Sequence, residues 1–215
     1  MKRLWIPLAL GLSLAACSST PPPPDWQLSA RSSLDNAAVA WLEGRDAVER
    51  AEFARARAAI ARTARPDLLA RAELHRCALR AATLQFEACS GFEALSPDAA
   101  PEDAAYARYL RNQTLPTDAA LLPPAHRAAL GAADPAAALR GIDDPITRLV
   151  AAGVAFGRAQ ASPGVVQLAV DTASAQGWPR PLLAWLGVQQ QAARAAGDAA
   201  AVQRLQRRID TVAPR

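Results

Sequence analysis

Proline and glycine interrupt this chain so often that it is limited to short elements joined by turns. The sequence contains 17 Pro and 11 Gly in 215 residues. Alanine, which has the highest helix propensity, makes up about a quarter of the chain. Alternating runs of Val, Ile, Thr and Tyr, which are typical of strands, are almost absent. We therefore predict an all-α fold of antiparallel helical hairpins, arranged either as a short α-solenoid or as an irregular helical bundle.

Residues 32–114 are predicted to form an N-terminal helical half. Its helices are expected over residues 34–43, 46–64, 66–86 and 102–112, with a loop over 90–101. Ser32 is the candidate N-cap of the first helix. The helix that opens at Pro66 has two apolar stripes, which reach Leu84 and Phe86. Such a broad apolar surface indicates neighbours on two sides of that helix.

The rest of the chain divides into a joint and a more regular end. Residues 115–141 contain six Pro and Gly residues and are expected to form a joint with short helical turns. Residues 142–215 are expected to form C-terminal helical hairpins. The turns and helices are predicted near 124–130, 135–140, 145–160 and 163–175, followed by one helix from Pro181 and a last one from Asp198 to Val212.

The C-terminal hairpins carry a weak internal repeat. Pro145 and Pro181 are 36 residues apart, and at this offset Leu149 aligns with Trp185 and Val150 with Leu186. The stretch Ala184-Trp185-Leu186-Gly187, followed by Gly197-Asp198, resembles tetratricopeptide repeats. The second helices lack the Ala-x-x-x-Phe pattern of that family. The resemblance implies a short solenoid of helical hairpins, and the irregular middle of the chain leaves the bundle open as the alternative.

The N-terminus predicts export from the cytoplasm. Lys2 and Arg3 precede an apolar run from Leu4 to Leu12, which is followed by small residues before a cysteine. This pattern is that of a secretory signal. Leu14-Ala15-Ala16-Cys17 resembles the lipobox of bacterial lipoproteins.

That resemblance implies a signal peptide over residues 1–16 and a lipid on Cys17, which would anchor the chain in a membrane. Ser18, in place of Asp, implies the periplasmic face of the outer membrane by the same resemblance. Residues 17–31, with four consecutive prolines from Pro21, are expected to form a semi-rigid tether between lipid and domain.

The net charge gives no support to nucleic-acid binding. Removal of Lys2 and Arg3 with the signal leaves 22 basic against 20 acidic residues, a formal charge of +2. So small an excess means that most Arg residues are opposed by carboxylates. We therefore expect a membrane contact through the lipid and an envelope protein as partner, and no nucleic acid.

Cys77 and Cys89 leave two outcomes open. In a single helix these residues, 12 positions apart, would be separated by about 18 Å along the axis. A disulfide needs Cα atoms about 5.5–6 Å apart. The bond therefore requires the chain to turn back between Leu79 and Cys89, where the sequence has neither Pro nor Gly. The alternatives are a disulfide, favoured by an oxidising periplasm, and two buried thiols.

No motif predicts catalysis, a metal site or a cofactor. His75 and His126 are the only histidines, and neither has a cluster of Cys, His or carboxylate residues at ligand spacing beside it. Asp143-Asp144 directly precedes Pro145, so N-capping explains it better than paired acid–base chemistry. We expect no catalytic residue, no metal ligand and no cofactor.

The tryptophans have a structural and a functional interpretation. Core packing is the first expectation for Trp41, Trp178 and Trp185. Trp26 follows the prolines and could contact the domain as part of the tether. The functional interpretation is a partner groove formed by Trp178, Leu182, Leu183 and Trp185.

The sequence therefore favours a lipid-anchored, non-catalytic protein-binding or scaffold module in the periplasm. One alternative is a cell-wall-associated enzyme without a recognisable motif. Another is a purely structural envelope component.

Overall fold

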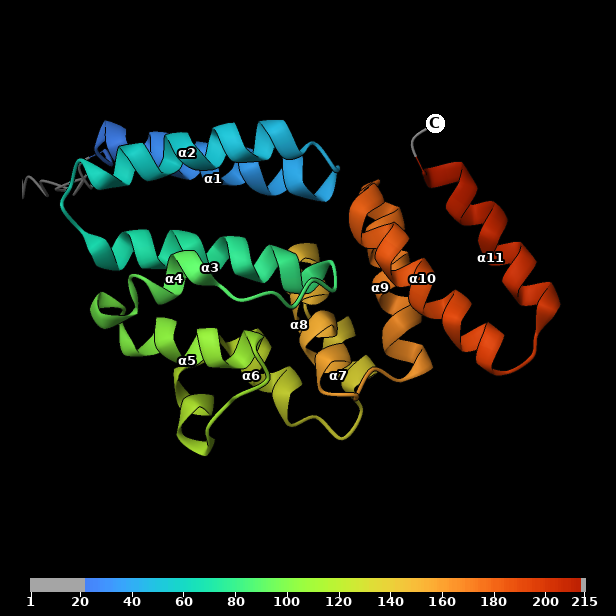
Figure 1. Cartoon of the computed structure of the whole chain (residues 1–215). Coiled ribbons are helices and arrows are strands. Elements are labelled where there is room, and N and C mark those ends of the chain that lie inside the picture. The colour runs from blue at the N-terminus through green and yellow to red at the C-terminus, as the bar shows by residue number, and fades with distance from the viewer. Residues whose placement is uncertain (1–21, 214–215) are drawn as a thin grey trace, which may run out of the picture.

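The computed structural model describes residues 22–213 (Figure 1), and within this range the chain is helical with no strand. The predicted all-α class is confirmed. The helices are α1 (Asp25–Leu42), α2 (Asp46–Ala61), α3 (Pro66–Ala82), α4 (Ser90–Glu93), α5 (Pro101–Leu110), α6 (Pro124–Leu130), α7 (Pro135–Arg140), α8 (Pro145–Gly157), α9 (Pro163–Gln176), α10 (Pro179–Ala195) and α11 (Ala199–Val212), with 3₁₀ turns η1 (Ser96–Asp98) and η2 (Pro116–Leu121).

The expected signal peptide over residues 1–16 and Cys17 lie outside the described residues, as does Pro21, the first residue of the proline run. Within residues 22–213, no helix has the length and apolar character needed to cross a membrane.

Proline and short polar side chains set where the helices begin. Proline occupies the first helical position of α3 and of each helix from α5 to α10, where its missing N–H costs nothing. Asp144 accepts a hydrogen bond from the Thr147 amide at 2.7 Å, and Asp198 accepts one from Ala201 at 2.8 Å. The capping interpretation of Asp144 is confirmed.

The first helix begins earlier than predicted. α1 starts at Asp25 and not near Leu34, so residues 25–31, assigned to the tether, belong to the folded domain. Pro24 supplies the extended N-cap, and Asp25 places a negative charge in the first turn. No Pro or Gly occurs between Pro24 and Gly44, so nothing in the sequence interrupts the helix before Ser32. The predicted N-cap role of Ser32 is therefore wrong.

The third helix ends earlier than its apolar stripes indicated. α3 stops at Ala82, and Leu84 adopts a left-handed conformation with φ +59°. The amides of Leu84 and Gln85 donate to the carbonyls of Ala81 and Arg80, which closes the helix end. The chain then turns back, and Cys77 is bonded to Cys89 with a Cα–Cα distance of 5.9 Å. Of the two outcomes left open by the sequence, the structure has the disulfide.

α3 lies at the centre of the molecule, as its two apolar stripes predicted. The α1–α2 hairpin covers one side of it, and α5 and α8 pack on the other (Figure 1). Gly153 in α8 permits the closest approach, because a Cβ at this position would overlap the backbone carbonyl of Ala81. Two buried indoles complete the end of α3: Trp41 donates to the carbonyl of Leu79 and Trp185 to that of Ala82, both at 3.2 Å.

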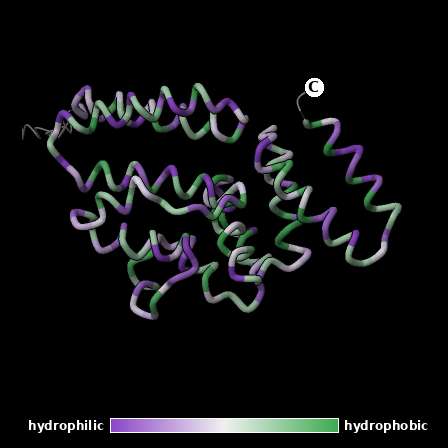
Figure 2. The backbone as a smooth tube through the Cα atoms, in the orientation of Figure 1, coloured by the Kyte–Doolittle hydropathy of each residue, from purple (hydrophilic) through white to green (hydrophobic). Residues whose placement is uncertain are grey.

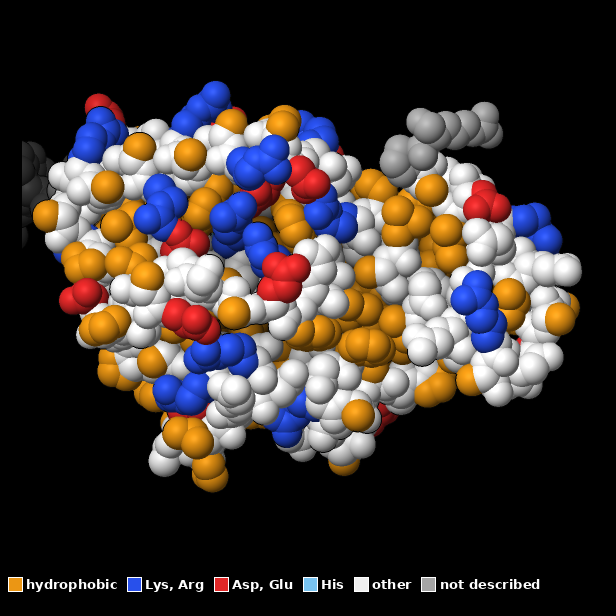
Figure 3. Space-filling view, in the orientation of Figure 1, with side chains coloured by type: hydrophobic (Ala, Val, Ile, Leu, Met, Phe, Trp, Pro, Cys, Tyr) orange, Lys and Arg blue, Asp and Glu red, His pale blue; other side chains and the backbone are white. Residues whose placement is uncertain are grey.

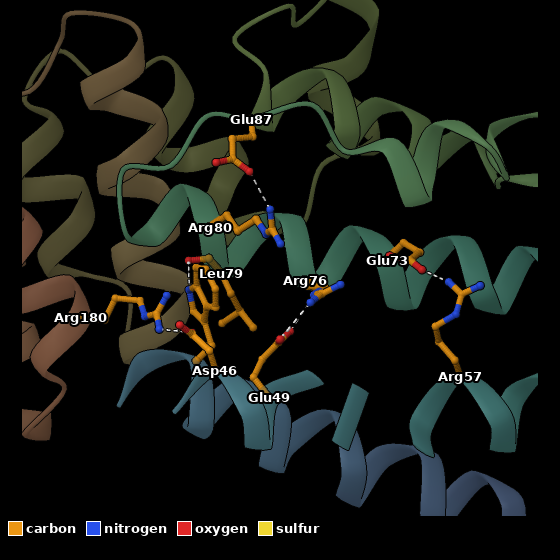
Figure 4. Close-up of polar contacts among 10 residues, drawn as sticks. Asp46, Glu49, Arg57, Glu73, Arg76, Leu79, Arg80, Glu87 and Arg180 are labelled. Carbon is orange, nitrogen blue, oxygen red and sulfur yellow. Dashed lines mark hydrogen bonds and ion pairs between the residues drawn. The ribbon is translucent and has the colours of Figure 1, made fainter. Parts of the chain in front are cut away.

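Ion pairs join the α1–α2 hairpin to the rest of the molecule. Figure 4 shows Arg76 bound to Glu49 through two hydrogen bonds of 2.6 and 2.9 Å, and Arg57 paired with Glu73. Figure 3 shows basic and acidic side chains gathered together over this part of the surface. Arg180 of α10 pairs with Asp46, and its guanidinium lies 3.9 Å from the ring centre of Trp41. Much of the arginine in this region therefore neutralises carboxylates within the fold.

The C-terminal part consists of successive hairpins, α8–α9 and α10–α11. The aligned residues Leu149, Val150, Trp185 and Leu186 are all buried, on α8 and α10. α11 packs on α10 through one face, and none of its residues within the described range is fully buried. Figure 2 shows many hydrophilic residues along α11, as expected for a helix with one face in solvent.

Candidate functional site

An apolar groove lies between α1 and α3, near the start of the domain. It has a volume of about 410 Å³, within the range of ligand sites. Its floor combines aromatic, aliphatic and alanine side chains from α1, α2 and α3. These residues are Trp26, Ala30, Leu34, Ile60, Leu68 and Ala72. We call this the α1–α3 groove.

Polar side chains surround that floor. Gln27, Arg31 and Asp35 follow each other along α1, and Arg71 lies opposite on α3. All four are exposed. Arg71 also donates to both carboxylate oxygens of Asp103 at 3.2 Å, which holds its guanidinium beside α5. An apolar centre within a polar rim is the usual composition of a protein-recognition surface.

His75 closes the groove with a neutral polar group. Burial lowers the pKa of its imidazole, while the more distant charges of Asp35 and Asp144 oppose that effect. Its Nε2 atom is buried and has no hydrogen-bond partner within residues 22–213. A buried polar atom without a partner is costly, and because Nε2 is closed to solvent, a ligand in the groove would reach it only after the His75 side chain moved.

The groove predicted around the C-terminal tryptophans is not formed as expected. The Trp185 side chain is fully buried against the core, so it cannot contact a partner. Trp178 is half-buried and packs beside Trp41, and Leu182 packs against the main core. Leu183 is half-buried. The core-packing interpretation of Trp41 and Trp185 is confirmed, because both side chains are buried and their indole N–H groups donate to carbonyls at the C-terminal end of α3.

The second histidine belongs to a buried aromatic cluster. His126 lies between two tyrosines, with its Nε2 3.2 Å from the hydroxyl of Tyr106 and its Nδ1 3.2 Å from that of Tyr109. Burial lowers the pKa of His126 to about 4 and raises the pKa of both tyrosines. The neutral imidazole uses one nitrogen as donor and the other as acceptor. This satisfied cluster links α5 to α6 and leaves no free group for chemistry on its ring nitrogens.

The sequence contained a signal for the α1–α3 groove that depended on where α1 begins. Trp26, Ala30, Leu34 and Ala37 follow helical spacing, and the first two lie upstream of the predicted start. Assigning residues 17–31 to a tether removed the first turns of this stripe. Trp26, expected to contact the domain from the tether, instead belongs to α1 of the domain, and its side chain lines the groove.

Within residues 22–213, no group of three or more His, Cys, Asp or Glu side chains could hold a metal ion. Comparison with protein-family models, curated proteins and solved structures gives no match. The candidate site therefore rests on the geometry of this chain.

Proposed function

We propose that this chain is a helical protein-binding or scaffold module, held at the periplasmic face of the outer membrane by a lipid on Cys17. The α1–α3 groove is the observation that supports it. Its floor would receive apolar side chains from an envelope protein, in the manner of an amphipathic helix laid into a groove. The rim carries both signs of charge, through Arg31, Asp35 and Arg71, and would fix the orientation of that segment.

The position of the groove along the chain fits an anchored module. Trp26 lies in the first turn of α1, directly after the prolines that follow Cys17. A partner bound there would be held near the start of the domain, close in sequence to the lipid.

Site-specific photocrosslinking in cells tests the groove. A photoreactive amino acid replaces Leu34 in the groove, and the matched control replaces Leu115, which is 50% exposed and lies outside it. We expect a discrete protein adduct from position 34 and not from position 115. Leu68→Glu, which places a charge on the groove floor, should remove the adduct while the circular dichroism of the chain stays helical. The same adducts from both positions, or none from position 34, would contradict the proposal.

The anchor is tested separately. Cys17→Ala should remove palmitate incorporation and shift the chain from the membrane to the soluble fraction. Membrane fractionation that persists in this variant would exclude the lipid on Cys17, whatever the photocrosslinks show.

A further inference from the structure

A second cavity lies where α3 and α5 end. It has a volume of about 340 Å³ and shares no lining residue with the α1–α3 groove. Its walls are the segment after α3, from Gln85 to Cys89, and the last residue of α5 with the turn that follows it, from Leu110 to Gln113. We call it the disulfide cavity, because the bond between Cys77 and Cys89 forms part of its wall.

The walls of the disulfide cavity are held in place from both sides. The disulfide ties the loop after α3 back to α3 itself. Leu84 and Asn112 adopt left-handed conformations, with φ of +59° and +60°, and each terminates its helix through backbone hydrogen bonds. A site with such fixed walls loses little conformational entropy when a ligand binds.

The charges around the cavity neutralise one another. Glu87 accepts a hydrogen bond from Arg80 at 2.9 Å, and Glu93 accepts one from Arg111 at 3.1 Å. Neither carboxylate is left without a cation, so the site offers no net charge to a ligand. Polar but neutral groups remain on the wall, since Gln85, Asn112 and Gln113 contribute side-chain amides. This composition favours an uncharged ligand that both donates and accepts hydrogen bonds.

One of these amides lacks a partner. The Oδ1 atom of Asn112 is buried and accepts no hydrogen bond from residues 22–213. Leaving a buried acceptor unsatisfied costs about 1–3 kcal/mol. Because that atom is closed to solvent, the hydrogen bonds of a ligand go to the more exposed amides of Gln85 and Gln113.

An aromatic ring completes the wall. Phe86 is 45% exposed although it lines the cavity. It stacks with Phe156 of α8, with ring centres 6.5 Å apart and planes inclined by 10°. Phe156 in turn meets Trp185 edge to face. The exposed ring is thus supported from the core, and its apolar face suits the C–H side of a sugar ring.

We propose that the disulfide cavity binds a neutral saccharide unit, with its ring against Phe86 and its hydroxyls bonded to the amides of Gln85 and Gln113. A hydroxyl is both donor and acceptor, so it can pair with either end of a side-chain amide. The proposal is independent of the α1–α3 groove and gives the chain a second kind of partner in the envelope.

Calorimetric titration of the purified full-length chain, in a zwitterionic detergent free of sugar, tests the site. The ligands are glucose, N-acetylglucosamine, and the β-linked tetrasaccharide of each. At least one should bind with a Kd below about 1 mM. Gln113→Ala removes an exposed amide from the wall, and it should weaken binding at least about tenfold. Phe86→Ala should do the same, because the ring is lost. Leu28→Ala, at an exposed position on α1, serves as the matched control and should bind normally.

Thermal unfolding of each variant shows whether it is folded. The absence of binding by all four saccharides up to about 10 mM would overturn the proposal. Binding unchanged in both Gln113→Ala and Phe86→Ala would place the saccharide elsewhere and overturn it equally. An uncharged dipeptide that binds more tightly than every saccharide would assign the cavity to peptides instead.

Discussion

At the scale of single residues, two glycines inside helices have opposite roles. A Cβ at Gly153 would overlap the carbonyl oxygen of Ala81, whereas a Cβ at Gly187 would meet nothing within 4 Å among the described residues. Gly153→Ala should therefore lower the free energy of unfolding by about 3 kcal/mol, because α8 must move away from α3. Gly187→Ala should raise it by about 0.5–1 kcal/mol through helix propensity. Urea unfolding measures both, and equal effects would contradict the close approach of the two helices.

His126 should make the fold sensitive to mild acid. Its pKa in the folded state, about 4, lies below the value of about 6.5 for an unfolded histidine. Between these two pKa values the unfolded chain binds more protons than the folded chain. The contribution of His126 to the free energy of unfolding is therefore fully present above the unfolded pKa, and it is lost as the pH drops toward the folded pKa. We expect a loss of about 2 kcal/mol between about pH 7 and pH 5.

The matched variant for that measurement is His126→Gln, which keeps polar atoms beside Tyr106 and Tyr109 but does not titrate. Its stability should change less over the same interval, with a remainder from His75, whose pKa is also lowered. A pH dependence identical to that of the parent chain would show that His126 is not the responsible group.

At the scale of elements, the disulfide fixes the turn that follows α3. It closes a segment of 12 residues, and a loop of that size contributes about 3 kcal/mol by restricting the unfolded chain. The double variant Cys77→Ala with Cys89→Ala should lose about that much in urea unfolding. The denatured parent chain, prepared without reductant, should show no titratable thiol at positions 77 and 89. Two free thiols there would exclude the bond.

At the scale of the whole molecule, burial is distributed unevenly along the chain. α8 and α9 contribute many fully buried residues to the main core, while α11 has none and packs chiefly on α10. Helices with few buried contacts open locally at low free energy. Hydrogen exchange should therefore be faster in α11 than in α8 and α9 at neutral pH. Equal protection in all three helices would show that α11 unfolds only with the core.

The sequence by itself determined the helical class and most helix starts, because these depend on neighbours along the chain. Proline at the first position and short polar caps such as Asp144 act within one turn, so α6 and α7 appear where predicted. The aligned residues of α8 and α10 also proved to be buried. The start of α1 was predicted wrongly, although the helical stripe through Trp26 and Ala30 was present in the sequence.

Only the tertiary structure decided where α3 ends, how the cysteines pair and which tryptophans are accessible. No residue between Leu79 and Cys89 signals a turn in sequence. The indoles of Trp41 and Trp185, from distant helices, satisfy the last carbonyls of α3. The α1–α3 groove and the disulfide cavity arise in the same way, from residues brought together by packing. Contacts of this kind are decided by burial across the whole core, and for that reason the spacing of residues along a single helix did not predict them.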